Sequence, residues 1–169
     1  LNPSSAASDV YKRQGFDVLG FCLDTIGDIM RVSKTENPGV TIGTLTGQEL
    51  PKDPLKNVAS VAAYSLLKAH SPNNGFRIDI EKRIKPGSGI GSSAASAAGA
   101  VFAINELLGR PYSRNGLVKF AMAGESLASG AAHADNLAPV LLGGFTLVRS
   151  NKTLDLSLIH ISEPTRLGF

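Results

Sequence analysis

Three stretches of the chain carry apolar residues at the spacing of one helix face. Residues 55–70 repeat them every three or four positions, and Asp53 precedes them as the expected helix cap. Residues 92–108 are rich in alanine, which predicts a helix buried on most sides, and residues 113–127 predict a third helix. After it, residues 130–142 predict a loop that holds at most one short helix.

Four shorter stretches have the pattern of β-strands. Residues 28–35 alternate weakly between two faces, whereas residues 76–81 alternate clearly between apolar and polar side chains, as in a half-buried strand. An Asn-Pro-Gly turn at 37–39 joins 28–35 to residues 40–45, which predicts a hairpin. Residues 144–149 predict a closing strand.

Together these elements predict one domain of the α+β class. A hairpin opens the pattern and strands then alternate with helices, which favours a mixed sheet with helices on one face. The domain is expected to cover residues 15–150 of the 169, a length sufficient for a hydrophobic core. Residues 1–14 and 151–169 carry neither period and are expected to be foreign or disordered segments.

Composition narrows the class of protein further. Hydrophobic residues make up 43% of the chain and charged residues 18%, which is typical of a globular domain. The net charge is +3, but within residues 15–150 there are 13 Lys and Arg against 11 Asp and Glu, so no nucleic-acid partner is expected. One cysteine, Cys22, excludes an intramolecular disulfide, and its apolar neighbours predict that it is buried.

The sequence also argues against a zinc site and a membrane-spanning segment. One cysteine and three scattered histidines predict no zinc-type cluster. No apolar run approaches the length of a membrane span, and the chain start lacks a basic segment followed by an apolar one. A cytoplasmic protein without a membrane partner is therefore expected.

The most distinctive stretch is the glycine-rich segment 85–100, which begins Lys-Pro-Gly-Ser-Gly-Ile-Gly-Ser-Ser-Ala-Ala. Its glycines permit positive φ and close backbone approach, and the segment leads directly into the predicted helix 92–108. The amide groups and the positive dipole end of such a helix favour an anion, most often a phosphate. A P-loop is excluded because Gly91, and not a lysine, precedes Ser92, and the spacing also disfavours a dinucleotide fingerprint.

This segment resembles the glycine-serine motif of the GHMP kinases, with Ile90 in place of the usual leucine. It departs from the family pattern at Lys85, where a proline is expected, because Pro86 comes one position later. The resemblance implies the ribosomal-protein-like N-terminal domain of that family, and ATP as the nucleotide. The residues that it implies in ATP binding are Asn57, Lys82, Lys85, Pro86, Gly87, Ser88, Gly89, Ile90, Gly91, Ser92, Ser93, Ala94 and Ala95.

Phosphoryl transfer also needs a divalent metal on oxygen ligands. In the GHMP kinases the metal is held by a serine of the loop and by a glutamate of a later helix. Ser93 and Glu125 match those places, so the resemblance implies that they bind Mg²⁺.

A second cluster, His133-Ala134-Asp135-Asn136-Leu137-Ala138-Pro139, resembles the homoserine-kinase branch of the family. It implies that His133, Asp135 and Asn136 bind the substrate, and that Asp135 is catalytic. A carboxylate here can bind the ammonium group of the substrate or orient its hydroxyl as a base, and the residues leave both roles open. Asp17 follows a Gly-Phe pair like that of the family's first motif and is the further expected substrate contact, although Tyr11 stands where that motif has an asparagine.

The resemblance implies phosphorylation of the L-homoserine hydroxyl by ATP, a step of threonine biosynthesis, in a full-length homodimer. It covers residues 15–149 only, so the family's C-terminal domain is expected to be absent and this chain to be inactive alone. Two alternatives stay open: a GHMP kinase that acts on another alcohol or on a phosphate, and an RNA-binding domain of ribosomal-protein architecture.

Overall fold

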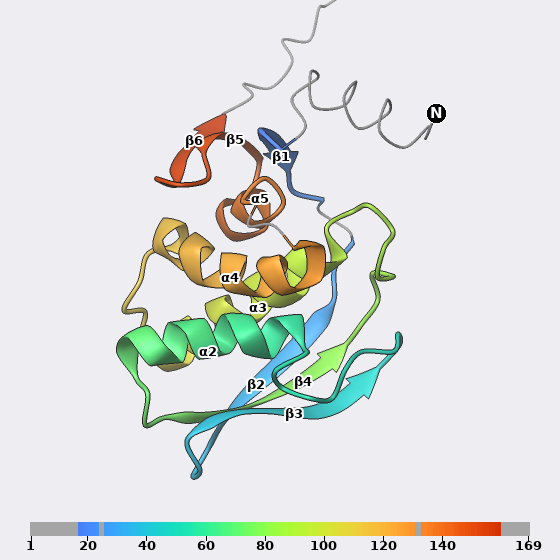
Figure 1. Cartoon of the computed structure of the whole chain (residues 1–169), viewed down its shortest axis with the longest axis vertical. Helices are drawn as coiled ribbons and strands as arrows, with labels where there is room; N and C mark the ends of the chain where they lie inside the picture. Colours follow the sequence, from blue (N-terminus) through green and yellow to red (C-terminus); the bar gives the residue numbers. More distant parts are fainter. Residues whose placement is uncertain (1–16, 24–25, 131–132, 160–169) are drawn as a thin grey trace, which may run out of the picture.

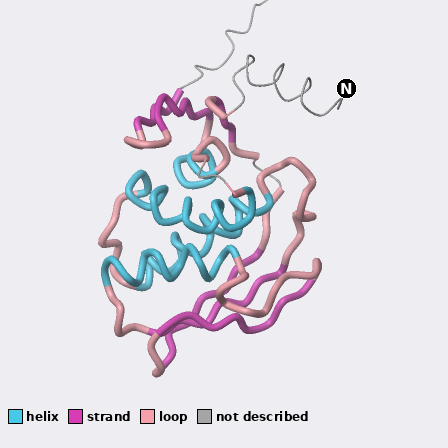
Figure 2. Tube along the Cα trace, viewed as in Figure 1, coloured by secondary structure: helices cyan, strands magenta, loops and turns pink. Residues whose placement is uncertain are grey.

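A computed structural model describes residues 17–23, 26–130 and 133–159. Figure 1 shows a layer of helices between two sheets, and Figure 2 shows the strands gathered at opposite ends of the molecule. The α+β class and the mixed sheet with helices on one face are confirmed, but the described strands form two sheets of three, and the second sheet was not predicted. Within the described part of the chain no helix is long and apolar enough to cross a membrane.

The larger sheet contains β2 (Ile29–Thr35), β3 (Gly39–Thr46) and β4 (Gly75–Glu81) in the order β2-β4-β3. β4 is antiparallel to β2 and parallel to β3, so the predicted hairpin is wrong. The reason is burial: Phe76 and Ile78 of β4 are fully buried, whereas β2 has no buried residue. The most apolar strand therefore takes the centre of the sheet and separates the two strands that precede it.

Two helices, α2 (Val58–His70) and α3 (Ser92–Leu107), lie on one face of this sheet, and α4 (Arg114–Ser129) packs over them on the side away from the sheet. α3 and α4 match their predictions, and Ser113 caps α4 by accepting a hydrogen bond from the Gly116 amide. α2 begins later than predicted, because the side chain of Asn57 caps it at the Ala59 amide. Asp53, the predicted cap, instead accepts from the Leu55 amide in the preceding turn.

The smaller sheet is antiparallel, with the order β1-β5-β6: β1 (Leu19–Phe21), β5 (Phe145–Ser150) and β6 (Asp155–Ile159). β5 is the predicted closing strand, and the short helix α5 (Leu137–Leu142) precedes it. β6 lies in the segment 151–169 that was expected to be foreign or disordered, and it pairs with β5 along its length. The other expected foreign segment, 1–14, lies outside the described residues, as does Tyr11.

Small residues let the helices pack closely around one core. Ala94, Ala97 and Ala98 of α3 are fully buried between the sheet and the neighbouring helices. A Cβ at Gly124 of α4 would lie 2.5 Å from the Val58 carbonyl oxygen of α2, so only glycine fits this crossing. The alanine content of α3 thus reflects burial, as the sequence predicts.

The prediction that Cys22 is buried is wrong, because its thiol is exposed. Cys22 directly follows β1, an edge strand of the small sheet, where Leu19 and Phe21 are also exposed. A run of apolar neighbours indicates burial only where a second layer covers the strand, and this face of β1 has none among the described residues.

Candidate active site

The glycine loop connects β4 to α3 and has the backbone conformation that its composition predicts. Gly87, Gly89 and Gly91 all have φ between 74° and 80°, a region that side chains with a Cβ rarely adopt. Gly91 caps α3 in the left-handed conformation without a side-chain hydrogen bond. The amides of the first helical turn are therefore not covered by a capping side chain, as an anion site requires.

A cavity of about 360 Å³ lies between this loop and the start of α2. Leu50, Pro51 and Val58 supply an apolar wall, and Pro86, Gly87 and Ser93 line the opposite side. We call this the loop cavity. The cavity can hold a flat apolar group next to the amides of the loop. A nucleotide, with its base beside its phosphates, has this arrangement.

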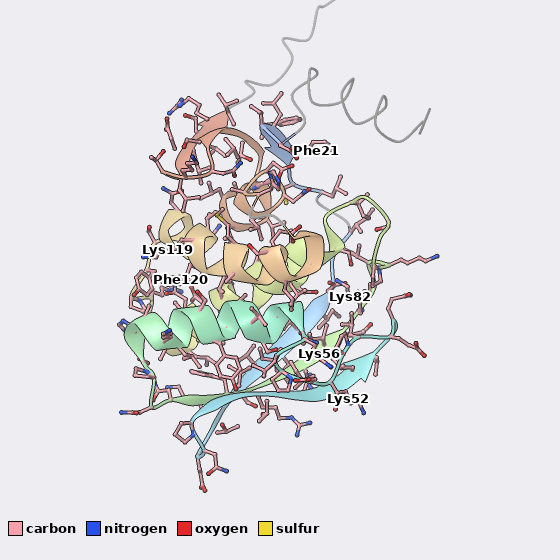
Figure 3. The ribbon with its side chains drawn as sticks, in the orientation of Figure 1. Phe21, Lys52, Lys56, Lys82, Lys119 and Phe120 are labelled. Carbon is pink, nitrogen blue, oxygen red and sulfur yellow. The ribbon has the colours of Figure 1, made fainter. Side chains whose placement is uncertain are left out.

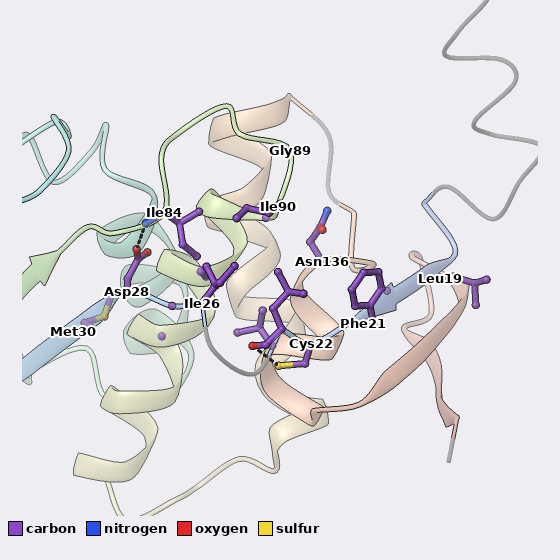
Figure 4. Close-up of a pocket in the computed structure, with 17 residues that line it drawn as sticks. Leu19, Phe21, Cys22, Ile26, Asp28, Met30, Ile84, Gly89, Ile90 and Asn136 are labelled. Atoms are coloured by element: carbon purple, nitrogen blue, oxygen red, sulfur yellow. Dashed lines mark hydrogen bonds between the residues drawn. The ribbon is translucent and has the colours of Figure 1, made fainter. Parts of the chain in front are cut away.

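A second cavity of about 380 Å³ lies on the other side of the loop. Figure 4 shows Gly89 and Ile90 facing Phe21 and Asn136 across it. Its lining is mostly apolar, and we call it the apolar cavity. The loop thus separates two spaces, with its 86–87 limb on the loop cavity and its 89–91 limb on the apolar cavity.

Ser93 and Glu125 meet between α3 and α4. The Ser93 hydroxyl donates to Glu125 Oε2 at 2.7 Å, and Glu125 is 8% exposed. Ser93 lines the loop cavity, and a hydroxyl beside a carboxylate is a pair of hard oxygen donors of the kind that Mg²⁺ selects. The donor set therefore fits the expected metal.

Asp17, His133 and Asp135 form a cluster between β1 and α5. Their donor atoms all lie within 4.8 Å of one another, and His133 Nδ1 is 3.8 Å from Asp17 Oδ1. Within the described residues, two buried side-chain atoms lack a hydrogen-bond partner, and both belong here: His133 Nδ1 and Asp135 Oδ1. A buried carboxylate oxygen without a partner is costly, so the cluster is suited to a cation or another hydrogen-bond donor.

Asn136 joins this cluster to the glycine loop. A Cβ built at Gly91 would lie 3.3 Å from Asn136 Oδ1, so the amide side chain packs directly against the loop where α3 begins. The Asn136 amide is also 3.4 Å from Asp135 Oδ2. The glycine loop and the cluster of Asp17, His133 and Asp135 are therefore adjacent, with the Asn136 side chain between them.

Comparison with known proteins identifies the family. The sequence profile described as GHMP kinases N terminal domain matches residues 57–144, which include the glycine loop, Glu125 and Asp135. The chain belongs to the GHMP kinase family.

Similar GHMP kinases include a homoserine kinase of Methanococcus maripaludis, 44% identical over 149 residues, which are 87% of this chain and 48% of that protein. A homoserine kinase of Methanocella arvoryzae is 45% identical over 151 residues, 89% of this chain and 48% of the relative. A crystal structure of homoserine kinase from Cytophaga hutchinsonii superposes with a TM-score of 0.82 at 45% identity, covering 88% and 48% of the two chains. The chain thus spans about half the length of these relatives. A mevalonate kinase of Methanococcus jannaschii, with a TM-score of 0.60 and 17% identity over 79% of this chain and 46% of that one, shares the fold.

Not all of the residues that the GHMP resemblance assigns to the nucleotide share one cavity. Those that line the loop cavity are Asn57, Lys82, Pro86, Gly87, Ser92 and Ser93. Those that line the apolar cavity are Gly89, Ile90, Gly91 and Ala95. Lys85 and Ser88 are exposed, Ala94 is fully buried, and none of these three borders either cavity.

Asn57 and Lys82 line the loop cavity, but their polar groups are bound to the protein. The Asn57 side chain accepts from the Ala59 amide and donates to the Pro51 carbonyl. The Lys82 ammonium donates to Asp28, to the Ser92 carbonyl and to the Ser96 hydroxyl. A hydrogen bond from the Lys82 ammonium to adenine would require one of these partners to be exchanged, whereas the Asn57 amide keeps a second N–H and a second lone pair. The expected role of both residues in base binding stays a prediction.

One feature of this candidate site has no signal in the sequence. The buried pair of Lys82 and Asp28 joins residues 54 positions apart, and no spacing along the chain reports such a contact. The structure does bring together Asp17, His133 and Asp135, three residues that the resemblance assigned to the substrate.

The pKa of Asp135 is shifted by its surroundings in this candidate site. Burial raises its pKa above the ordinary value of 3.8, and the nearby Asp17 carboxylate raises it further. A hydrogen bond from the Asn136 backbone and the charge of His133 act in the opposite direction and are weaker. The buried, ionised carboxylate of Asp135 therefore costs folding free energy, and a bound cation would reduce this cost.

Asp135→Asn should therefore stabilise the unliganded protein at neutral pH. Above its raised pKa the wild-type carboxylate is ionised in both the folded and the unfolded state, and its burial then costs folding free energy. As the pH falls through the raised pKa toward 3.8, the folded state binds the proton first and this cost disappears. We expect a higher Tm for the variant at pH 7 and a difference that shrinks toward pH 4 in thermal unfolding; a variant that is less stable at pH 7 would show that Asp135 supports the fold.

Proposed function

We propose that this chain provides the nucleotide-binding and substrate-binding half of a homoserine kinase, which transfers the γ-phosphoryl group of ATP to the hydroxyl of L-homoserine. The observation that carries the proposal is the buried, unpartnered Asp135 Oδ1 beside the glycine loop. A primary ammonium group supplies the donors that this carboxylate lacks. The homoserine kinases that cover most of this chain at 44–45% identity support the same substrate.

On the nucleotide side, the amides at the start of α3 would hold the phosphates and the apolar wall of the loop cavity would hold the base. Ser93 and Glu125 would hold Mg²⁺, which neutralises charge on the phosphates when it is bound. What the chain contributes is positioning: α3 and α4 hold the Ser93 hydroxyl 2.7 Å from the Glu125 carboxylate, and Ser93 lines the cavity.

On the substrate side, Asp135 and Asp17 would bind the ammonium group, and His133 would complete the cluster. We favour this role over that of a base for Asp135, because two carboxylates beside one imidazole attract a cation. Asn136 lies between the cluster and Gly91, so a hydroxyl on the same small molecule would point toward the phosphates. Because the two halves of the site are separated by this one side chain, a short amino alcohol would reach both.

Calorimetric titration of the purified chain tests this proposal. MgATP should bind more tightly than ATP alone, and L-homoserine should then bind with heat release. 4-Hydroxybutyrate keeps the hydroxyl and lacks the ammonium group, so it should not bind, whereas 2-aminobutyrate should still bind. Equal binding of 4-hydroxybutyrate, or RNA binding in a gel shift without any nucleotide binding, would contradict the proposal. The expected cytoplasmic location, the absence of a nucleic-acid partner and the homodimer stay predictions.

Gly91→Val should weaken MgATP binding at least tenfold. Its Cβ would lie 3.3 Å from Asn136 Oδ1, and its φ of 74° strains a branched residue by about 1–2 kcal/mol. The matched control is Gly109→Val, which has a similar φ of 85° and nothing within 4 Å of its Cβ. Unchanged MgATP affinity in a folded Gly91→Val protein, measured by calorimetry, would remove the loop from the nucleotide site.

A further inference from the structure

Lys82 and Asp28 form a closed polar network beneath the glycine loop. Their side chains are 2% and 5% exposed, and the ammonium donates to Asp28 Oδ2. Lys82 Nζ also donates to the Ser92 carbonyl at 2.7 Å and to the Ser96 hydroxyl at 2.9 Å. An ammonium has three donors, so all of them are used inside the protein. Figure 3 labels Lys82 at the end of β4, next to the loop.

The carboxylate of Asp28 holds the other end of the loop. Its Oδ1 accepts from the Arg83 amide at 2.9 Å and from the Ile84 amide at 3.0 Å, the latter drawn in Figure 4. The Ser92 hydroxyl donates to the Ile84 carbonyl at 2.9 Å. The residues that enter the loop and those that leave it are thus bound to one ion pair.

Between these two anchors the loop has little support of its own. Residues 85–90 are exposed, and the Ser88 amide donates to the Lys85 carbonyl at 3.2 Å. A Cβ at Gly87 or Gly89 would meet nothing within 4 Å. The position of this loop therefore depends on where its two ends are fixed, because its middle contacts so little of the domain.

We propose that Lys82 is a positioning residue: paired with Asp28, it fixes the start of α3 and the glycine loop in the geometry that binds phosphate, and its ammonium group does not hydrogen-bond to the nucleotide. The proposal rests on the proposed function for its ligand, MgATP. It replaces the expected contact between Lys82 and adenine, because no donor of the ammonium remains for a base.

A double variant separates positioning from stability. Lys82→Met or Asp28→Asn alone leaves a buried group without its partner and should destabilise the domain strongly. Lys82→Met combined with Asp28→Leu removes both charges, and such replacements often restore stability. The double variant still lacks the hydrogen bond from Lys82 to the Ser92 carbonyl and the one from the Ile84 amide to Asp28. Its Tm should therefore recover while its affinity for MgATP stays at least tenfold weaker than wild type.

The matched control is Leu67→Ala, which removes a buried side chain from the far end of α2, about 15 Å along the helix from the loop cavity. It should lower the Tm and leave MgATP affinity within twofold of wild type. Should the double variant not recover its Tm, an affinity loss greater than that of Leu67→Ala still supports positioning. An affinity equal to that of the control overturns it.

Hydrogen exchange measured without nucleotide keeps the two proposals distinguishable. In the double variant the amides of residues 84–93 should exchange at least tenfold faster than in wild type, while those of β4 and α2 are unchanged. A wild-type chain that binds no MgATP would contradict the proposed function and leave this test intact. Unchanged exchange in residues 84–93 of the double variant would overturn the positioning role. Ser96→Ala, which removes one acceptor and no charge, should show the same local change to a smaller degree.

Discussion

Asp135→Asn should reduce phosphorylation of L-homoserine by on the order of 10²–10³ while MgATP affinity is unchanged. Asparagine keeps the shape of the side chain and removes its charge, so the substrate ammonium loses a charge-assisted hydrogen bond. Binding is measured on the chain itself. Turnover is measured by ADP release in a chimera in which residues 17–159 replace the matching half of the Methanococcus maripaludis homoserine kinase.

The control for this change is Asp155→Asn, the same substitution at an exposed carboxylate that pairs with Arg149 on β5. It should leave turnover unchanged, because an exposed ion pair contributes little. Wild-type turnover in the chimera with Asp135→Asn would remove Asp135 from the site. A parallel loss of MgATP affinity would instead place Asp135 at the nucleotide and contradict the division into two sites.

Gly20→Ala should have the second large effect, on both the fold and the substrate cluster. A Cβ at Gly20 would lie 1.8 Å from the Asp135 backbone oxygen and 2.9 Å from Pro139 Cγ. Backbone cannot move aside as a flexible side chain can, so β1 must separate from the loop that carries Asp135. We expect a loss of about 3 kcal/mol in unfolding free energy, at the upper end for one added methyl group. Homoserine binding should weaken at least tenfold.

Gly27→Ala is the matched control for Gly20→Ala, because nothing lies within 4 Å of its Cβ. It should change the unfolding free energy by no more than about 0.5 kcal/mol. It should also leave homoserine binding unchanged. Denaturant unfolding and calorimetry measure the two effects. A Gly20→Ala protein with wild-type stability would show that β1 does not pack against the Asp135 loop as described.

Local signals account for the parts of this fold that the sequence predicts correctly. α3 and α4 each have a cap or a glycine at the start and a helical apolar pattern, so no distant contact is needed to recognise them. The glycine loop is equally local, and its three positive φ values follow from its glycines. The structure of each of these elements is determined by residues that lie close together in the sequence.

Apart from the start of α2, where Asn57 and not Asp53 is the cap, the errors concern contacts between distant segments. β4 takes the place between β2 and β3 because Phe76 and Ile78 are the most buried residues of these three strands, and a turn at 37–39 does not report that competition. The small sheet pairs Leu19 with Leu147, which no local pattern can show. For the same reason the proximity of Asn136 to Gly91 could not be predicted, although both residues were candidates.

The most direct test of the central claim is phosphorus NMR of the chimera with ATP, Mg²⁺ and L-homoserine. The account predicts that a phosphomonoester signal of O-phospho-L-homoserine appears as ATP is consumed, and that Asp135→Asn suppresses it. A folded chimera that forms no phosphomonoester from L-homoserine, or that forms it equally well with Asp135→Asn, would contradict the assignment of this chain as the substrate-binding half of a homoserine kinase.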